Sequence, residues 1–67
     1  MGISNLITIE VREMLMVKGE RQFKIKATYP KIPINTIQEI HGHLYGANGA
    51  YLGYIIERSN TKITVEI

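Results

Sequence analysis

Residues 6–17 read Leu-Ile-Thr-Ile-Glu-Val-Arg-Glu-Met-Leu-Met-Val, and this stretch decides the fold that we expect. Up to Arg12 apolar and polar residues alternate, the period of two that is typical of a half-buried β-strand. From Met14 to Val17 four apolar residues follow one another, and they cannot all face one side of a flat strand. We therefore predict a strand over 6–17 whose second half is covered on both faces.

Three arrangements account for this two-sided coverage: a β-bulge near Glu13, a strand that passes into a barrel, or a second subunit on the outer face. A chain of 67 residues has little interior in which to bury such a stretch, or the second one at residues 52–56. The sequence therefore predicts a protein interface, with a closed barrel as the alternative. The residues expected in this interface are Met14, Met16, Leu52, Tyr54 and Ile56.

The residues that follow predict a meander. Residues 18–21 are polar around a glycine and suit a hairpin loop before a strand at 21–29, in which Phe23, Ile25, Ala27 and Tyr29 share one face. Two prolines in residues 29–33 cannot donate ladder hydrogen bonds, so we expect the chain to leave the sheet there.

Residues 34–57 allow two interpretations. Apolar residues at near-helical spacing favour a helix near 35–45, whereas Gly42, Gly46 and several β-branched residues oppose it. A two-residue turn at Asn48-Gly49 instead gives a hairpin in which His43 faces Tyr54.

The expected fold is mainly β, a single domain over residues 1–67. We predict a small five-stranded antiparallel SH3-like barrel or sheet, with a turn of helix before the third strand and strands near 6–17, 21–29, 38–46, 50–58 and 62–67. The alternative is an α+β sheet of ββαββ order with one helix near 35–45.

The composition bears on catalysis, metals and cofactors. The chain has no cysteine and no aspartate, and no glycine-rich loop joins a strand to a helix, so we expect no enzyme and no cofactor. His41 and His43 lack further ligands nearby, so we expect no metal site. The tyrosines at 45, 51 and 54 cluster on the predicted hairpin, either as a stacking platform or as a seal on the core edge.

The mild positive charge, +2 with a pI near 9.1, permits anionic partners. A nucleic-acid surface would use the predicted sheet face and comprise Arg12, Lys24, Lys26, Lys31 and Tyr54. Glutamates at 10, 13 and 20 lie on the same hairpin and would partly neutralise it. Since no apolar run is long enough for a membrane span and residues 1–5 do not resemble a signal peptide, we expect a cytoplasmic protein without membrane contact.

Residues 44–55, Leu-Tyr-Gly-Ala-Asn-Gly-Ala-Tyr-Leu-Gly-Tyr-Ile, resemble the hairpin of PRC-barrel domains. The likeness is confined to these residues, and Ala47 stands where a charged residue usually precedes the turn, so we assign no family. The sequence thus predicts a small non-enzymatic binding module that acts through protein–protein contact or self-assembly as a homo-oligomer. The alternative is a regulatory or accessory protein that binds nucleic acid.

Overall fold

The computed structural model describes residues 5–67, and its regular elements are strands apart from one 3-10 turn. The elements, in chain order, are β1 (Leu6–Val17), β2 (Glu20–Pro33), the 3-10 turn η1 (Ile34–Thr36), β3 (Gln38–Ile40), β4 (His43–Tyr45), β5 (Tyr51–Arg58) and β6 (Lys62–Glu66). They form one six-stranded sheet in the order β2-β1-β6-β5-β4-β3.

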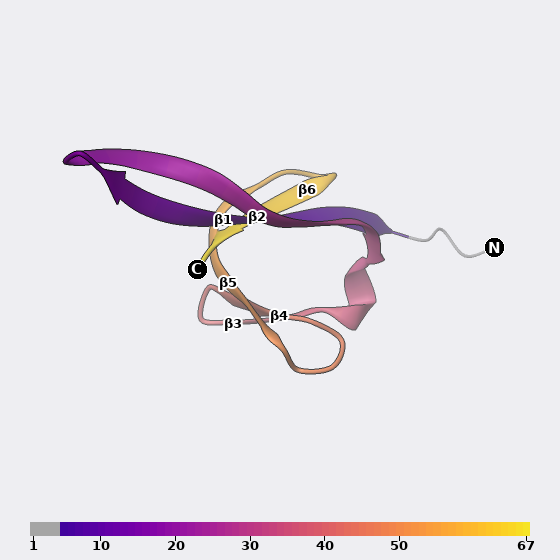
Figure 1. Cartoon of the computed structure of the whole chain (residues 1–67). Helices are drawn as coiled ribbons and strands as arrows, with labels where there is room; N and C mark the ends of the chain where they lie inside the picture. Colours follow the sequence, from indigo (N-terminus) through magenta and orange to yellow (C-terminus); the bar gives the residue numbers. More distant parts are fainter. Residues whose placement is uncertain (1–4) are drawn as a thin grey trace.

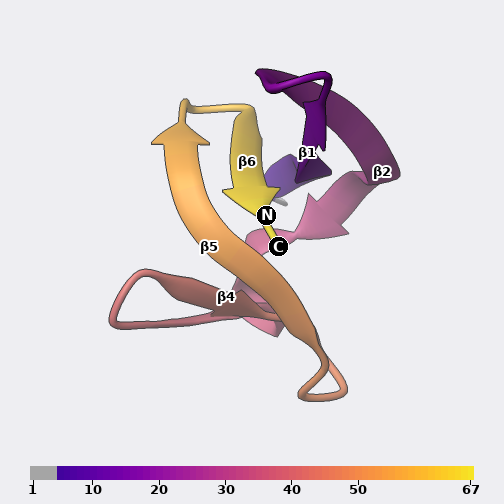
Figure 2. The same ribbon diagram turned by 60° about the vertical axis from the view of Figure 1, so that its left-hand side comes forward.

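The sheet is mixed, because β6 returns to lie parallel to β1 while every other neighbouring pair is antiparallel. The ribbon curls, so that β3 and β4 lie across from the first half of β1 (Figure 1) and β5 bends along its whole length (Figure 2). The two edge strands, β2 and β3, are not hydrogen-bonded to each other in the described chain, so the curled sheet stays open.

The core fills the inside of the curl. Its buried side chains come from β1, β4 and β6, namely Ile7, Ile9, Val11, Leu44, Ile63 and Val65. The alternating half of β1 supplies three of them, and its pairing with β6 places Ile9 beside Ile63 and Val11 beside Val65. Burial of this alternating set explains why the first half of β1 is fixed in place.

The second half of β1 leaves the body. Together with the start of β2 it forms a two-stranded arm, residues 13–25, that projects away from the curled sheet (Figure 1). The radius of gyration is 13.1 Å, compared with about 11 Å for a compact chain of this length. The molecule is accordingly elongated, with extents of 53 × 19 × 17 Å.

The mainly-β prediction is confirmed, but the predicted five strands are wrong because the strand expected at 38–46 is two strands. His41 and Gly42 have φ angles of 51° and 83°, so they make a tight two-residue turn that folds Ile40 back onto His43. The helix considered near 35–45 is not formed, and η1 matches the turn of helix expected before the third strand. The closed barrel is not formed either, while the SH3-like assignment stays a prediction.

The prediction that residues 29–33 leave the sheet is also wrong. β2 continues to Pro33, which lies opposite Leu6, and Lys31 adopts a φ of 55° where the register shifts. Because β2 is an edge strand, a proline there can turn its missing N–H away from the ladder. The expectation that residues 1–5 are not a signal peptide stays a prediction, and residues 1–4 lie outside the described residues.

Candidate functional site

The arm is built on a tight turn. Lys18 and Gly19 have φ angles of 52° and 79°, which is the type I′ geometry that matches the twist of two antiparallel strands. Val17 therefore lies opposite Glu20, and the register continues without interruption to Glu13 opposite Lys24. The predicted hairpin loop at 18–21 is thus shorter than expected, and β2 begins at Glu20.

A bulge separates the arm from the body. Val11 pairs with Ala27 but Arg12 pairs with Ile25, so β2 carries one extra residue, Lys26, at this point. Val11 and Arg12 are consecutive in a strand and face opposite sides. Ile25 is therefore on the outer side of the sheet with Arg12, whereas Ala27 is on the core side with Val11.

This bulge corrects the prediction that residues 23, 25, 27 and 29 of β2 share one face. Phe23 lies opposite Met14, so both belong to the outer side together with Ile25. The outer side of the arm thus carries four apolar residues, which we call the arm face: Met14, Met16, Phe23 and Ile25.

The arm face is open to solvent. Its side chains are between 40% (Met14) and 63% (Met16) exposed. At its base the guanidinium of Arg12 lies over the Phe23 ring, 5.5 Å from the centroid. This cation–π contact covers part of Phe23, but no other residue within 5–67 buries any of the four side chains.

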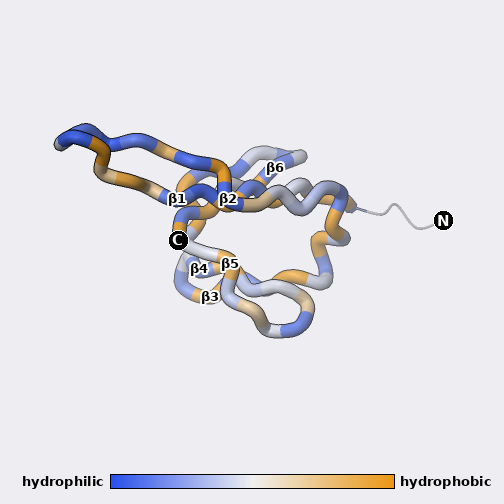
Figure 3. Tube along the Cα trace, in the orientation of Figure 1, coloured by the Kyte–Doolittle hydropathy of each residue, from blue (hydrophilic) through white to orange (hydrophobic). Residues whose placement is uncertain are grey.

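The other side of the arm is mixed. Leu15 and Val17 are 38% and 39% exposed and alternate with Glu13, whose carboxylate lies 3.9 Å from the Lys26 amine. Figure 3 shows the resulting asymmetry: the β1 strand of the arm is mainly hydrophobic, whereas the β2 strand is mainly hydrophilic. The four apolar residues 14–17 therefore lie together on one strand of the arm, two on each side.

The residues predicted for a protein interface fall into two groups. Met14 and Met16 lie in the arm face, but the other three are on β5, which β6 separates from β1 in the sheet. Of these, Leu52 is partly buried against the core, while Tyr54 and Ile56 are exposed. Sequence reasoning missed Phe23 and Ile25, although the Lys18-Gly19 turn alone would have placed Phe23 opposite Met14.

The predicted nucleic-acid residues are dispersed. Arg12 and Lys24 lie on opposite sides of the arm, because Arg12 pairs with Ile25 and Lys24 with Glu13. The Lys26 amine lies near Glu13, and Arg12 lies 3.8 Å from Glu10. Tyr54 is on the outer side of β5 opposite Glu66. The structure thus does not gather these cations on one face.

An aromatic cluster occupies the outer side of β4 and β5. The Nδ1 atom of His43 lies 2.8 Å from the Tyr51 hydroxyl, and the His43 ring meets the Tyr54 ring edge-on at 5.3 Å. Tyr45 and Tyr51 are in contact at 5.4 Å. The predicted pairing of His43 with Tyr54 is confirmed, although the loop has three residues, Ala47 to Gly49, because Gly46 bonds to Ala50. The rings pack against one another.

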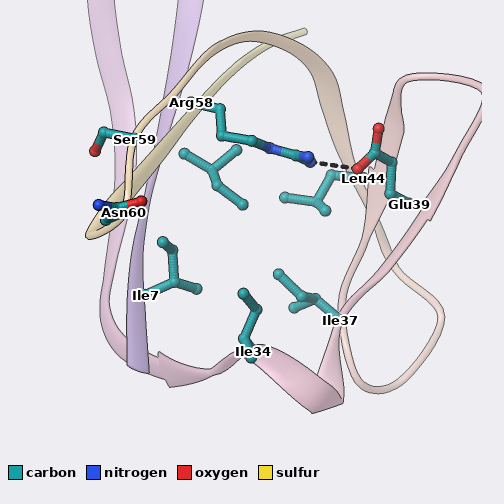
Figure 4. A pocket seen from close by; sticks show the side chains of 9 residues that line it. Ile7, Ile34, Ile37, Glu39, Leu44, Arg58, Ser59 and Asn60 are labelled. Atoms are coloured by element: carbon teal, nitrogen blue, oxygen red, sulfur yellow. Dashed lines mark hydrogen bonds and ion pairs between the residues drawn. The ribbon is translucent and has the colours of Figure 1, made fainter. Parts of the chain in front are cut away.

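A cavity of about 360 Å³ lies at the side of the core (Figure 4). Its walls are mainly apolar, with Ser59 and Asn60 at one side, and Arg58 and Glu39 form an ion pair at its rim. The side chains of Ile7, Ile34, Ile37 and Leu44 surround it. Because both rim charges are paired with each other, the rim presents no free charge for a ligand.

Three further findings bear on function. Within residues 5–67, no three His, Cys, Asp or Glu side chains come together as metal ligands would. None of the described elements is a helix long and apolar enough to cross a bilayer. The chain matches no protein-family model, and searches of curated proteins and of solved structures found no similar protein.

Proposed function

We propose that this chain is a self-assembling interaction module that associates with further copies of itself through its arm. The observation that carries the proposal is the arm face, four large apolar side chains that are 40–63% exposed on a projecting hairpin. An isolated two-stranded hairpin is marginally stable in water, and one that exposes apolar side chains on both sides gains stability from a partner.

Other surfaces support binding less well. The rings of the aromatic cluster contact one another, although Tyr51 and Tyr54 are about half exposed, and the two charged side chains at the cavity rim are paired with each other. The arm face has no such internal partner apart from the Arg12 contact with Phe23. Methionine, which supplies half of the arm face, is flexible and packs well against varied surfaces.

The test is sedimentation velocity of the wild type over a hundredfold range of concentration, beside two lysine variants. We expect the wild type to associate as its concentration rises. Met16→Lys should weaken association about tenfold or more, because a lysine at the interface must lose its hydration or keep the partner away. Gln22→Lys adds the same charge to the β2 strand of the arm, on the other side, and should retain association.

If the wild type stayed monomeric at every concentration, the proposed self-assembly would be wrong. If Met16→Lys and Gln22→Lys weakened association equally, net charge and not the arm face would govern association. A pool of DNA and RNA in the same experiment at low and high salt tests the nucleic-acid alternative. Complexes that form only at low salt, through Arg12, Lys24, Lys26 or Lys31, would favour it.

A further inference from the structure

We infer that the second copy docks by adding its own β1 to the edge of the arm, so that the two arms form one four-stranded antiparallel sheet around a two-fold axis. This inference rests on the proposed self-assembly and names the segment that each copy contributes. The segment is the second half of β1, residues 13–17, and we call its side away from β2 the open edge.

Besides stretches of at most three residues at the start of β1 and the ends of β5, the described sheet has unpaired edges on β2, on β3 and on the second half of β1, and the first two are protected. β3 is only three residues long, and short edge strands resist pairing. β2 carries lysines, two register shifts and two prolines, all of which oppose the addition of a strand. The open edge of β1 has none of these features beyond the carboxylate of Glu13, so it is the edge on which a strand can add.

Two observations fix which backbone groups face the open edge. The N–H of Ile67 donates to the carbonyl oxygen of Arg12 at 3.0 Å, so the Arg12 carbonyl points away from β2. Val17 and Glu20 close the two-residue turn, so the Val17 groups point toward β2. Because direction alternates along a strand, both observations place the N–H and C=O groups of Met14 and Met16 on the open edge.

These groups are self-complementary in one register. An antiparallel pair exchanges two hydrogen bonds between opposite residues that both point inward. Met14 opposite Met16 of a second copy, and Met16 opposite its Met14, use all four outward groups on each strand and leave the occupied Arg12 carbonyl alone. The two-fold axis then passes between the two copies of Leu15, which form a close pair without hydrogen bonds.

The side-chain pattern fits this register. Four consecutive apolar residues are typical of a strand with neighbours on both sides, not of an edge. In the paired sheet, residues 14–17 of each copy become central. The charged β2 strands take the two outer positions, where lysine is favoured. On the outer side, Met14 lies between Phe23 of its own arm and the partner's Met16.

The experiment uses single-cysteine variants, because the natural chain has no cysteine. Leu15→Cys brings two thiols together at the axis, in the close non-bonded pair whose Cβ separation approaches that of a disulfide. Gln22→Cys is the matched control, since Gln22 lies opposite Leu15 on the same side of the arm. Its two copies would be about 14 Å apart, three strand spacings, in the proposed sheet.

After mild oxidation, Leu15→Cys should shift from 7.6 kDa to twice that mass on non-reducing electrophoresis, and Gln22→Cys should not. Crosslinking of Gln22→Cys, or of neither variant while the wild type sediments as an oligomer, would overturn the edge pairing and leave self-assembly intact. No association of the wild type at any concentration would overturn both.

A second pair of variants separates hydrogen bonding from side-chain contact. Met16→Pro removes an N–H that points to the open edge and should abolish dimers. Arg21→Pro, directly opposite, removes an N–H that points to the β2 edge and should leave dimers intact. Circular dichroism of both variants checks that the body stays folded, and equal dimerisation of the two variants would contradict the inferred edge.

Discussion

The two halves of β1 belong to one continuous strand but have different surroundings. The first half, up to Arg12, lies between β2 and β6 and buries Ile7, Ile9 and Val11. The second half, from Met14 to Val17, pairs with β2 alone and exposes all four of its apolar side chains. The first half, where apolar and polar residues alternate, is covered by other strands of the same chain. The second half, where four apolar residues follow one another, is left exposed.

Hydrophobicity alone therefore does not identify which residues form the core of this small sheet. The second half of β1 is at least as apolar as the first, yet it contributes nothing to the buried cluster. What separates the two halves is a third strand, β6, on one side. A partner strand supplied by a second copy would give the second half the same environment.

The largest expected effect tests whether the body half alone holds the monomer together. Ile9→Ala should lower the free energy of unfolding by about 2–5 kcal/mol, because Ile9 is 1% exposed and its removal leaves a cavity. Met16→Ala should change it by less than about 0.5 kcal/mol, because Met16 is 63% exposed. Urea unfolding at low protein concentration measures both free energies. Similar losses of stability in the two variants would contradict the conclusion that only the first half of β1 stabilises the monomer.

The next largest effect comes from replacing Gly53 in the body, compared with Gly19 in the arm. Gly53 has a φ of 141°, and a Cβ there would lie 2.9 Å from the Glu66 carbonyl oxygen, so Gly53→Ala adds a backbone clash to conformational strain. Gly19, at the tip of the arm, has a φ of 79° with nothing within 4 Å. We expect losses of about 2–3 kcal/mol for Gly53→Ala and about 1 kcal/mol for Gly19→Ala.

Thermal unfolding of the two glycine variants checks this order. If Gly19→Ala destabilised the protein as much as Gly53→Ala, backbone strain alone would account for both losses. The close packing around Gly53 would then contribute nothing that distinguishes the body from the arm.

The smallest effect concerns a buried hydroxyl. Thr64 is 1% exposed, and its Oγ1 atom has no hydrogen-bond partner, so Thr64→Val should stabilise the body by about 1 kcal/mol. The reverse exchange in the arm, Val17→Thr, should change monomer stability by less than about 0.5 kcal/mol because Val17 is 39% exposed. A lower melting temperature for Thr64→Val would show that the hydroxyl is satisfied.

Much of the fold could be predicted from local patterns. Alternation located the first half of β1 and β6, and turn chemistry located the hairpin of β4 and β5 that pairs His43 with Tyr54. The parallel pairing of β1 with β6 could not be predicted, because it joins distant residues and no local pattern encodes it. The His41-Gly42 turn was missed since a non-glycine residue with positive φ leaves a weak sequence signal.

Two of the four residues of the arm face could be predicted from the sequence. Met14 and Met16 stand out because four apolar residues interrupt an alternating strand. Phe23 and Ile25 were placed with Ala27 and Tyr29, and only the bulge at Lys26 moves them to the outer side. Bulges are set by the pairing of two strands, so a single strand read alone does not reveal them.

Amide hydrogen exchange of Met14 and Met16 shows directly whether a second strand pairs with the open edge of β1. In the monomer these two N–H groups face the open edge and should exchange rapidly, while that of Ile9 is protected in the core sheet. We predict that Met14 and Met16 become protected as protein concentration rises, and that Phe23, whose N–H faces the β2 edge, does not. Rapid exchange of Met14 and Met16 at every concentration would contradict the account.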